Sequence, residues 1–389
     1  MSETRRTIKK AAAYIRECAD FAHSRIRSAY QKIQAQNLTE KIKSVPNIIS
    51  NLNVSSVRTA FKKGIHKTKS VIRRYFKRLK RISKKLSASW RILLICIPTF
   101  LFCYYGIGSI LTENTDTSTE YSLRETRIPM LETPLAMSFL LKREVDGKMW
   151  TPNLPPVFPA YILDNMPNFQ IGIVSAVKDV TAVLRRFNQN TEAQKKDIKN
   201  AYQYLQYPPN IWLMTKKGKF NLAPSSNAQY RKAAAELQQF AKDGVYYSSA
   251  ADFDALLKKI NAGLQNATSR NESHQAEHSA DWIDTQADNL FYYNRGYAFA
   301  MWQIARVMGA DYRETILENN AYTEWTYFAN SLRKAAKLKP SVVRNGSAES
   351  LTAPNHLIMQ NYYLLRAITA AEKIRNKILQ ESFKENNAD

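Results

Sequence analysis

Residues 92–111 read ILLICIPTFLFCYYGIGSIL, a stretch of 20 residues without a charge. A helix of this length spans about 30 Å, the hydrocarbon thickness of a bilayer. Pro98 is compatible with a membrane helix. Trp90, Tyr104 and Tyr105 are typical interfacial anchors, although the two tyrosines lie deep in the stretch. A buried core helix is rarely so long and so free of charge, and the stretch therefore predicts one membrane-spanning helix.

The charge of the chain changes sharply across this stretch. Up to Arg91 there are 24 Lys and Arg against four acids, a balance of +20, and the remainder holds 33 against 29, a balance of +4. After Glu40 the next acid is Glu113. Because basic flanks stay in the cytoplasm, we expect a cytoplasmic N-terminus and a C-terminal domain on the other side of the membrane.

The basic segment 1–91 carries two helical patterns. An apolar stripe with heptad spacing runs over residues 8–33, with alanine at half of its positions, and is compatible with self-association or with a partner helix. A second amphipathic stripe over residues 54–86 ends in a cluster of eight cations, which are Arg73, Arg74, Lys77, Arg78, Lys80, Arg81, Lys84 and Lys85. This pattern is typical of contact with anionic lipid headgroups. Two other interpretations are charges that only fix topology and a nucleic-acid site, and the second lacks any recognised fold or stacking motif.

The remainder of the chain predicts an all-α domain resembling a helical bundle. Apolar residues recur with helical spacing over residues 168–187, 227–242, 249–264, 288–308, 312–338 and 354–380, and no alternating strand pattern is found. Gly309 is a candidate left-handed stop after the fourth of these helices. We divide the chain into a basic segment 1–91, a transmembrane helix 92–111, a polar connector 112–135 and a helical domain 136–389. This domain contains no cysteine, so its core alone must stabilise it.

One motif in this domain suggests a metal site. The sequence His274-Gln-Ala-Glu277-His278 matches the H-x-x-E-H pattern, in which two histidines hold zinc and a glutamate acts as general base. The surrounding residues 268–280 are polar throughout and show no apolar face, so we interpret this segment as a solvated loop. We therefore assign no metal ligand, no catalytic residue and no cofactor.

Several polar residues remain as candidates for ligand binding, although each also has a structural explanation. Asp164, Asn165 or Asn168 is expected to cap the helix that follows. Asn294 and Arg295 lie within an aromatic helix, where we expect them to bond a neighbouring turn such as residues 344–347. The complete set of candidates is Asp164, Asn165, Asn168, Asp288, Asn294, Arg295, Asn345 and His356.

Five stretches together resemble the DUF2333 family, a group of bacterial membrane proteins with a shared domain of unknown function. They are LDNMPNF (163–169), DNLFYYNRG (288–296), MWQIARVMGADY (301–312), RNGS (344–347) and NHLIMQNYYLLRA (355–367). The resemblance covers about residues 130–378, and the basic segment before it is longer than expected for the family. It implies a bacterial inner-membrane location with the domain in the periplasm, and it implies no activity.

These observations favour a single-pass inner-membrane protein whose periplasmic domain is an interaction or scaffold module rather than an enzyme. Its expected partners are the membrane and envelope proteins or polymer, and nucleic acid is not expected. One alternative is a periplasmic hydrolase with a polar cleft, and another is a tether that acts through the basic segment. A deep cleft with converging carboxylates would favour the hydrolase. A broad exposed apolar patch would favour the interaction module.

Overall fold

A computed structural model describes residues 88–123, 131–213, 223–242, 249–278, 284–346 and 354–386. The chain divides into two compact units, Met1–Thr99 and Phe100–Asp389. The apolar stripe predicted over residues 8–33 and the cations predicted to meet lipid, from Arg73 to Lys85, lie outside the described residues.

The apolar stretch forms a continuous helical segment. Helix α4 (Ala88–Phe102) contains Pro98, and the chain continues through a π-helical turn, η1 (Cys103–Ile107), into the short helix α5 (Gly108–Thr112). Within it, Ile95–Thr112 has a mean hydropathy of 1.6 and only 6% of these residues are buried. It is the one helix, among the described residues, that is long and apolar enough to cross a bilayer, so the prediction is confirmed in length and composition.

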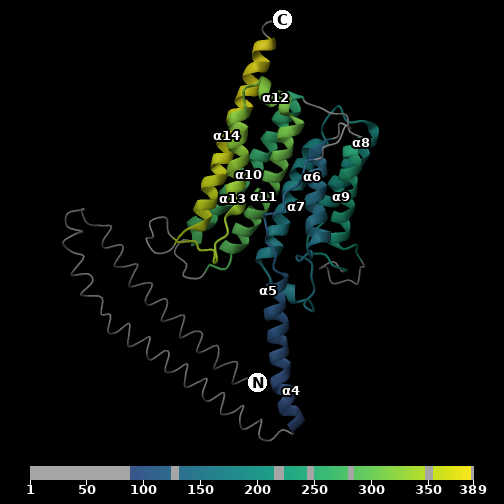
Figure 1. The fold of residues 1–389 in the computed structure, drawn as a ribbon, viewed down its shortest axis with the longest axis vertical. Helices are drawn as coiled ribbons and strands as arrows, with labels where there is room; N and C mark the ends of the chain where they lie inside the picture. Colours follow the sequence, from purple (N-terminus) through teal and green to yellow (C-terminus); the bar gives the residue numbers. More distant parts are fainter. Residues whose placement is uncertain are drawn as a thin grey trace, which may run out of the picture. The chain divides into compact units, whose positions relative to one another are not determined.

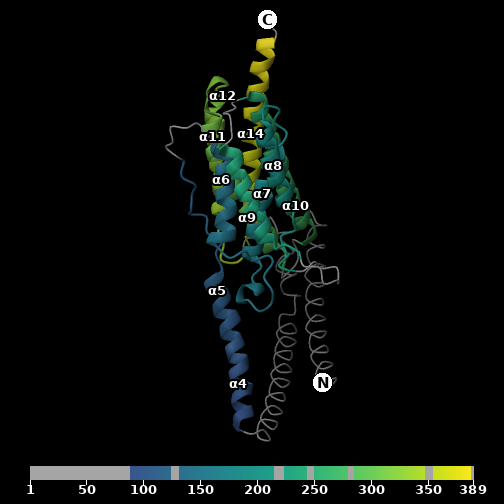
Figure 2. The ribbon, with the colours of Figure 1, turned by 90° about the vertical axis from the view of Figure 1, so that its right-hand side faces the viewer.

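The second unit is all-α, as predicted. Its long helices run side by side (Figures 1 and 2). They are α6 (Glu132–Lys142), α7 (Asn165–Leu184), α8 (Glu192–Leu205), α9 (Ser226–Lys242), α10 (Ala250–His278), α11 (Ala287–Asp311), α13 (Tyr322–Lys337) and α14 (His356–Asn386). Shorter turns are η2 (Arg143–Gly147), η3 (Pro159–Ile162) and α12 (Arg313–Glu318). The described residues form no strand, and an isolated bridge joins Asn345 to Asn355.

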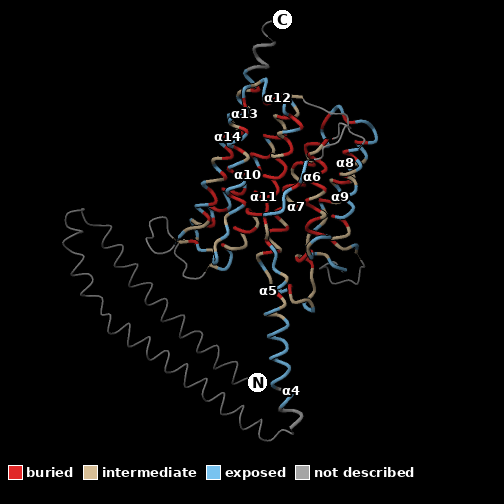
Figure 3. The backbone as a smooth tube through the Cα atoms, in the orientation of Figure 1, coloured by how far each residue is buried: buried red, intermediate tan, exposed pale blue. Residues whose placement is uncertain are grey.

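The centre of the bundle is the contact between α7 and α11, where buried residues are concentrated (Figure 3). Two glycines allow these helices to approach closely. A Cβ on Gly172 would overlap the carbonyl oxygen of Tyr293, and a Cβ on Gly296 would overlap that of Phe169. Phe169 and Phe299 fill the space beside this contact, with ring centroids 6.0 Å apart.

Three expectations about helix limits are wrong. Residues 268–278 are not a solvated loop but the last turns of α10, because the polar side chains of Asn271 and His274 have partners on α14 and before α11. Gly309 lies inside α11, where the absence of a side chain leaves room for the Trp325 indole. The helix expected over residues 312–338 is two helices, since Asn320 adopts a left-handed φ of 53° between them.

Candidate functional site

One end of the bundle gathers most of the predicted polar residues, because three helices begin there. Each start presents backbone N–H groups without a helical partner, and an Asp or Asn side chain accepts from them. The Asp164 carboxylate accepts from the N–H of Asn165 at 2.9 Å at the start of α7. Asn355 accepts from the N–H of Ile358 at 2.9 Å at the start of α14.

The third start, that of α11, is capped by Asp284, a residue that the sequence analysis did not single out. One oxygen of Asp284 accepts from the N–H groups of Gln286 and Ala287, both at 3.0 Å. The other lies 2.7 Å from Nε2 of His274 and 3.1 Å from the Asn345 amide nitrogen. Burial alone would raise the pKa of Asp284, but these hydrogen bonds lower it below its ordinary value. Asp284 therefore joins the end of α10 to the start of α11 and to the segment before α14.

The other predicted residues at this end also have structural partners. The Asn168 amide donates to Asn289 at 2.6 Å and to the carbonyl of Asp164 at 2.8 Å, which joins the first turns of α7 and α11. Burial, and then the charge of Asp164, raise the pKa of Asp288. His356 accepts the N–H of Arg344 at its Nδ1, 2.9 Å away. These contacts match the capping and structural roles expected from the sequence.

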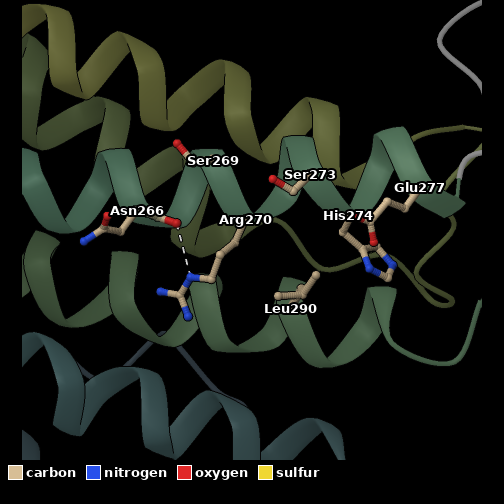
Figure 4. A pocket seen from close by; sticks show the side chains of 7 residues that line it. All are labelled: Asn266, Ser269, Arg270, Ser273, His274, Glu277 and Leu290. Carbon is tan, nitrogen blue, oxygen red and sulfur yellow. Dashed lines mark hydrogen bonds between the residues drawn. The ribbon is translucent and has the colours of Figure 1, made fainter.

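A shallow hollow of about 520 Å³ lies beside this end, along α10 (Figure 4). It is lined by Asn266, Ser269, Arg270, Ser273, His274, Glu277 and Leu290. The guanidinium of Arg270 lies 4.7 Å above the Tyr293 ring, and the rings of His274 and His278 are 4.5 Å apart. Across the described residues, no three His, Cys, Asp or Glu side chains are grouped to hold a metal. The hollow could hold a small polar group at the surface, but Asp284 already occupies one nitrogen of its histidine.

Asn294 and Arg295 lie deeper in the bundle, and the expectation that they bond residues 344–347 is wrong. The Asn294 amide donates to Asn271 at 2.8 Å, and Asn271 in turn donates to Asn361 on α14 at 2.7 Å. Arg295 is 2% exposed and donates from Nε to the carbonyl of Ala336 at 3.0 Å. Asn294 therefore faces α10 and, through Asn271, is linked to α14, whereas Arg295 faces α13 and the Phe169 ring of α7.

A second cluster of buried charges lies where η2 and the residue after it approach α11. It consists of Arg143, Glu144, Lys148 and Arg295, and of these the sequence predicts only Arg295 as a candidate. Arg143 donates to the Glu144 carboxylate and to the carbonyl of Asp116, and Lys148 lies 3.7 Å from the same carboxylate. The charged run REVDGK, directly after an apolar helix, was the available signal.

Burial disfavours the charged forms of the side chains in this cluster. Burial raises the pKa of Glu144 despite the charges of Arg143 and Lys148, and burial lowers the pKa of Lys148 to about 8. The guanidinium groups lie over aromatic rings, with Arg143 4.6 Å from the centroid of Phe299. Nη1 of Arg295 and Oε2 of Glu144 have no hydrogen-bond partner within the described part of the chain. Buried polar atoms without hydrogen-bond partners lower the free energy of unfolding. A contribution to stability through packing therefore does not explain the cluster by itself.

Taken together, these features define a helical domain that follows a helix of membrane-spanning length, with its polar residues engaged mainly in capping and cross-linking helices. The chain belongs to DUF2333, a family described as an uncharacterised protein conserved in bacteria, which matches residues 146–260 and 246–381. No curated protein and no solved structure matches the chain.

Proposed function

We propose that this protein is a single-pass protein of the bacterial inner membrane and that its periplasmic helical domain is a protein-binding module. The apolar, exposed surface of Ile95–Thr112 and the basic residues that precede it support the span and its direction. Membership of a bacterial family supports the location. The binding role rests on one surface of α13 and α14.

That surface, the α13–α14 face, is apolar and aromatic although it points to solvent. On α14 the exposed side chains Ile358, Met359, Tyr362 and Leu365 follow one another at helical spacing. Tyr327 of α13 belongs to the same surface, because the guanidinium of Arg366 lies 4.5 Å from the Tyr327 ring and 5.3 Å from the Tyr362 ring. Tyrosine and arginine at the centre of an apolar patch are the composition that protein interfaces favour.

The charges around this face indicate the chemistry of its partner. The exposed cations Lys334 of α13 and Lys373 of α14 lie on the two helices that form it. Of the acids of these helices whose side chains are described, Glu324 pairs with Lys377 at 2.8 Å and Glu372 with Arg375 at 3.1 Å. The face is therefore apolar at its centre and basic at its rim. We expect a partner protein whose own surface is apolar at its centre and acidic at its rim.

Site-specific photocrosslinking in intact cells tests this role. A photoreactive residue at Tyr362 or Leu365 should give a discrete protein adduct, whereas one at the exposed Lys199 on α8 should not. Arg366→Glu should abolish the adduct without loss of helical content, because it reverses the charge beside both tyrosines. Identical adducts from Tyr362 and Lys199, or adducts that persist in the Arg366→Glu variant, would contradict the proposal.

The alternative of an envelope hydrolase receives less support from the polar end of the bundle. Of the candidate residues, Asp164 accepts from a backbone N–H at the start of α7 and His356 accepts from the backbone N–H of Arg344. The adjoining hollow is shallow and open to solvent. The cationic segment that ends in Lys84 and Lys85 supports a further element of the proposal, which is contact with anionic lipid on the cytoplasmic side.

A further inference from the structure

Residues 154–163, between η2 and α7, are unusual for a surface loop, since they contain no charge and expose large apolar side chains. Residues 154–163 read LPPVFPAYIL. Val157 is 64% exposed, Tyr161 53% and Ile162 55%. Trp212 and Leu213 adjoin them, because the Trp212 ring meets that of Phe158 edge-on at 6.1 Å. We call the five exposed side chains Val157, Tyr161, Ile162, Trp212 and Leu213 the basal apolar surface.

The loop that carries this surface is hydrogen-bonded to the C-terminal part of the apolar helical segment. The hydroxyl of Tyr104 donates to the carbonyl of Val157 at 2.8 Å, and that of Tyr105 donates to the carbonyl of Pro156. One turn further, a Cβ on Gly108 would lie 2.7 Å from Cβ of Pro159, so the helix and the loop are in close contact there. Both tyrosines lie in the π-helical turn η1, and the carbonyls that accept from them belong to two consecutive residues of the loop.

The position of these contacts along the helix sets the depth of the loop. Tyr105 precedes Leu111, the end of the uncharged stretch, by six residues, which is about 9 Å along a helix. In a bilayer the tyrosine hydroxyls would lie below the headgroups, where an unpaired hydroxyl is costly. The carbonyls of Pro156 and Val157 satisfy them there. The loop that supplies these carbonyls must then lie at the same depth.

We propose that the basal apolar surface inserts into the outer leaflet of the membrane beside the spanning helix and that lipid covers it. An amphipathic element at the interface buries its apolar side about 5–10 Å deep, which agrees with the depth of the tyrosine contacts. Tyrosine and tryptophan are also the side chains that the interface favours. The inference rests on the membrane span of the proposed function. Its consequence is that two elements anchor the domain, so that it is held in one orientation above the bilayer rather than swinging on a linker.

Lipid-borne quenchers of fluorescence test the insertion in the full-length protein. Cys18, Cys96 and Cys103 are replaced by alanine, and a single cysteine at Ile162 carries an environment-sensitive fluorophore. Leu101, 45% exposed on the spanning helix, is the control for lipid contact, and Leu317 is the matched control for water. Leu317 is a 50% exposed apolar residue on α12, at the opposite end of the bundle from α5 (Figures 1 and 2). Circular dichroism checks that each labelled chain keeps its helical content.

In vesicles containing nitroxide-labelled lipid, the labels at Leu101 and Ile162 should be quenched several-fold more strongly than the label at Leu317. If Leu101 is quenched but Ile162 behaves like Leu317, the insertion is wrong and the span remains. If Leu101 is not quenched, the membrane span of the proposed function is wrong as well. If Ile162 is shielded from both lipid quencher and aqueous iodide, protein covers the surface, and the lipid assignment is wrong.

Discussion

Asp311 and Thr133 lie 178 residues apart in the chain, and one oxygen of the Asp311 carboxylate accepts two hydrogen bonds from Thr133. The backbone N–H of Thr133 donates at 2.9 Å and its hydroxyl at 2.6 Å, while the N–H of Glu132 donates to the other oxygen at 3.1 Å. The last residue of α11 therefore caps the start of α6. Burial nevertheless raises the pKa of Asp311 to about 6, because these hydrogen bonds offset desolvation only in part.

This pKa predicts a pH dependence of stability. Because the folded-state pKa is raised above the ordinary 3.8, the contribution of Asp311 is full below pH 3.8 and is lost as pH rises through about 6. The shift of about two units corresponds to roughly 3 kcal/mol. The free energy of unfolding of the parent, relative to that of Asp311→Asn, should fall by about this amount between pH 4 and pH 7. Urea denaturation of the detergent-solubilised chain measures the difference, and parallel curves would show that Asp311 does not titrate in this range.

Arg295 offers a test of whether the buried charge cluster serves stability. Its side chain is 2% exposed and lies 5.4 Å from the ring centroid of Phe169. Arg295→Met keeps most of the apolar packing and removes a charge that forms no ion pair with any described residue, so it should be at least as stable as the parent. Arg295→Ala leaves a cavity and should cost about 2–4 kcal/mol. Thermal unfolding of both variants decides: a methionine variant as unstable as the alanine variant would mean that the guanidinium itself stabilises the fold.

Replacing Asp164 and replacing Asp284 should lower the free energy of unfolding by different amounts. Asp164 bonds one N–H, while Asp284 bonds two N–H groups and also His274 and Asn345. Asp164→Ala should therefore cost less than about 1 kcal/mol and Asp284→Ala about 2–3 kcal/mol. Equal losses of stability, measured by chemical denaturation, would rule out Asp284 as the residue that joins α10 and α11.

The basic segment should bind anionic lipid through electrostatic attraction. A peptide of residues 58–89, which contains Arg73, Arg78 and Lys85, should bind vesicles that contain anionic lipid and dissociate as salt rises, because salt screens its charges. Vesicle sedimentation measures the binding, with neutral vesicles as the control. Equal binding to both kinds of vesicle would mean that apolar insertion dominates.

Much of this fold can be predicted from helical periodicity, and the errors have more than one cause. The apolar stretch and the helices α7, α9, α10, α11, α13 and α14 are predicted because their apolar residues recur at fixed spacing, whereas the buried helix α6 has no counterpart among the predicted helices. The sequence does not predict that residues 268–278 are helical. The contacts that stabilise His274 and Asn271 come from residues outside α10, and no local sequence pattern contains them. Helix α8 is highly polar, and it begins with a capping box between Thr191 and Gln194 that was not recognised.

The candidate site shows the same limit. Asp164 and Asn168 were found because helix starts have a local signature. Asp284 has a local role at the start of α11 that the sequence analysis omits, and its bonds to His274 and Asn345 on other segments have no local signature. The cluster around Glu144 is buried because η2 packs against α11. The sequence alone does not contain this packing, and its pattern of charges is that of an ordinary solvated segment.

Reporter fusions test whether a single span places the helical domain outside the cytoplasm. Alkaline phosphatase, which is active only outside the cytoplasm, is fused after Asp389 in one strain and after Lys85 in another. The 14 cations without an acid from Arg58 to Arg91 predict that the first fusion is active and the second is inactive. The reverse pattern, or equal activity of the two fusions at equal protein levels, would contradict the account.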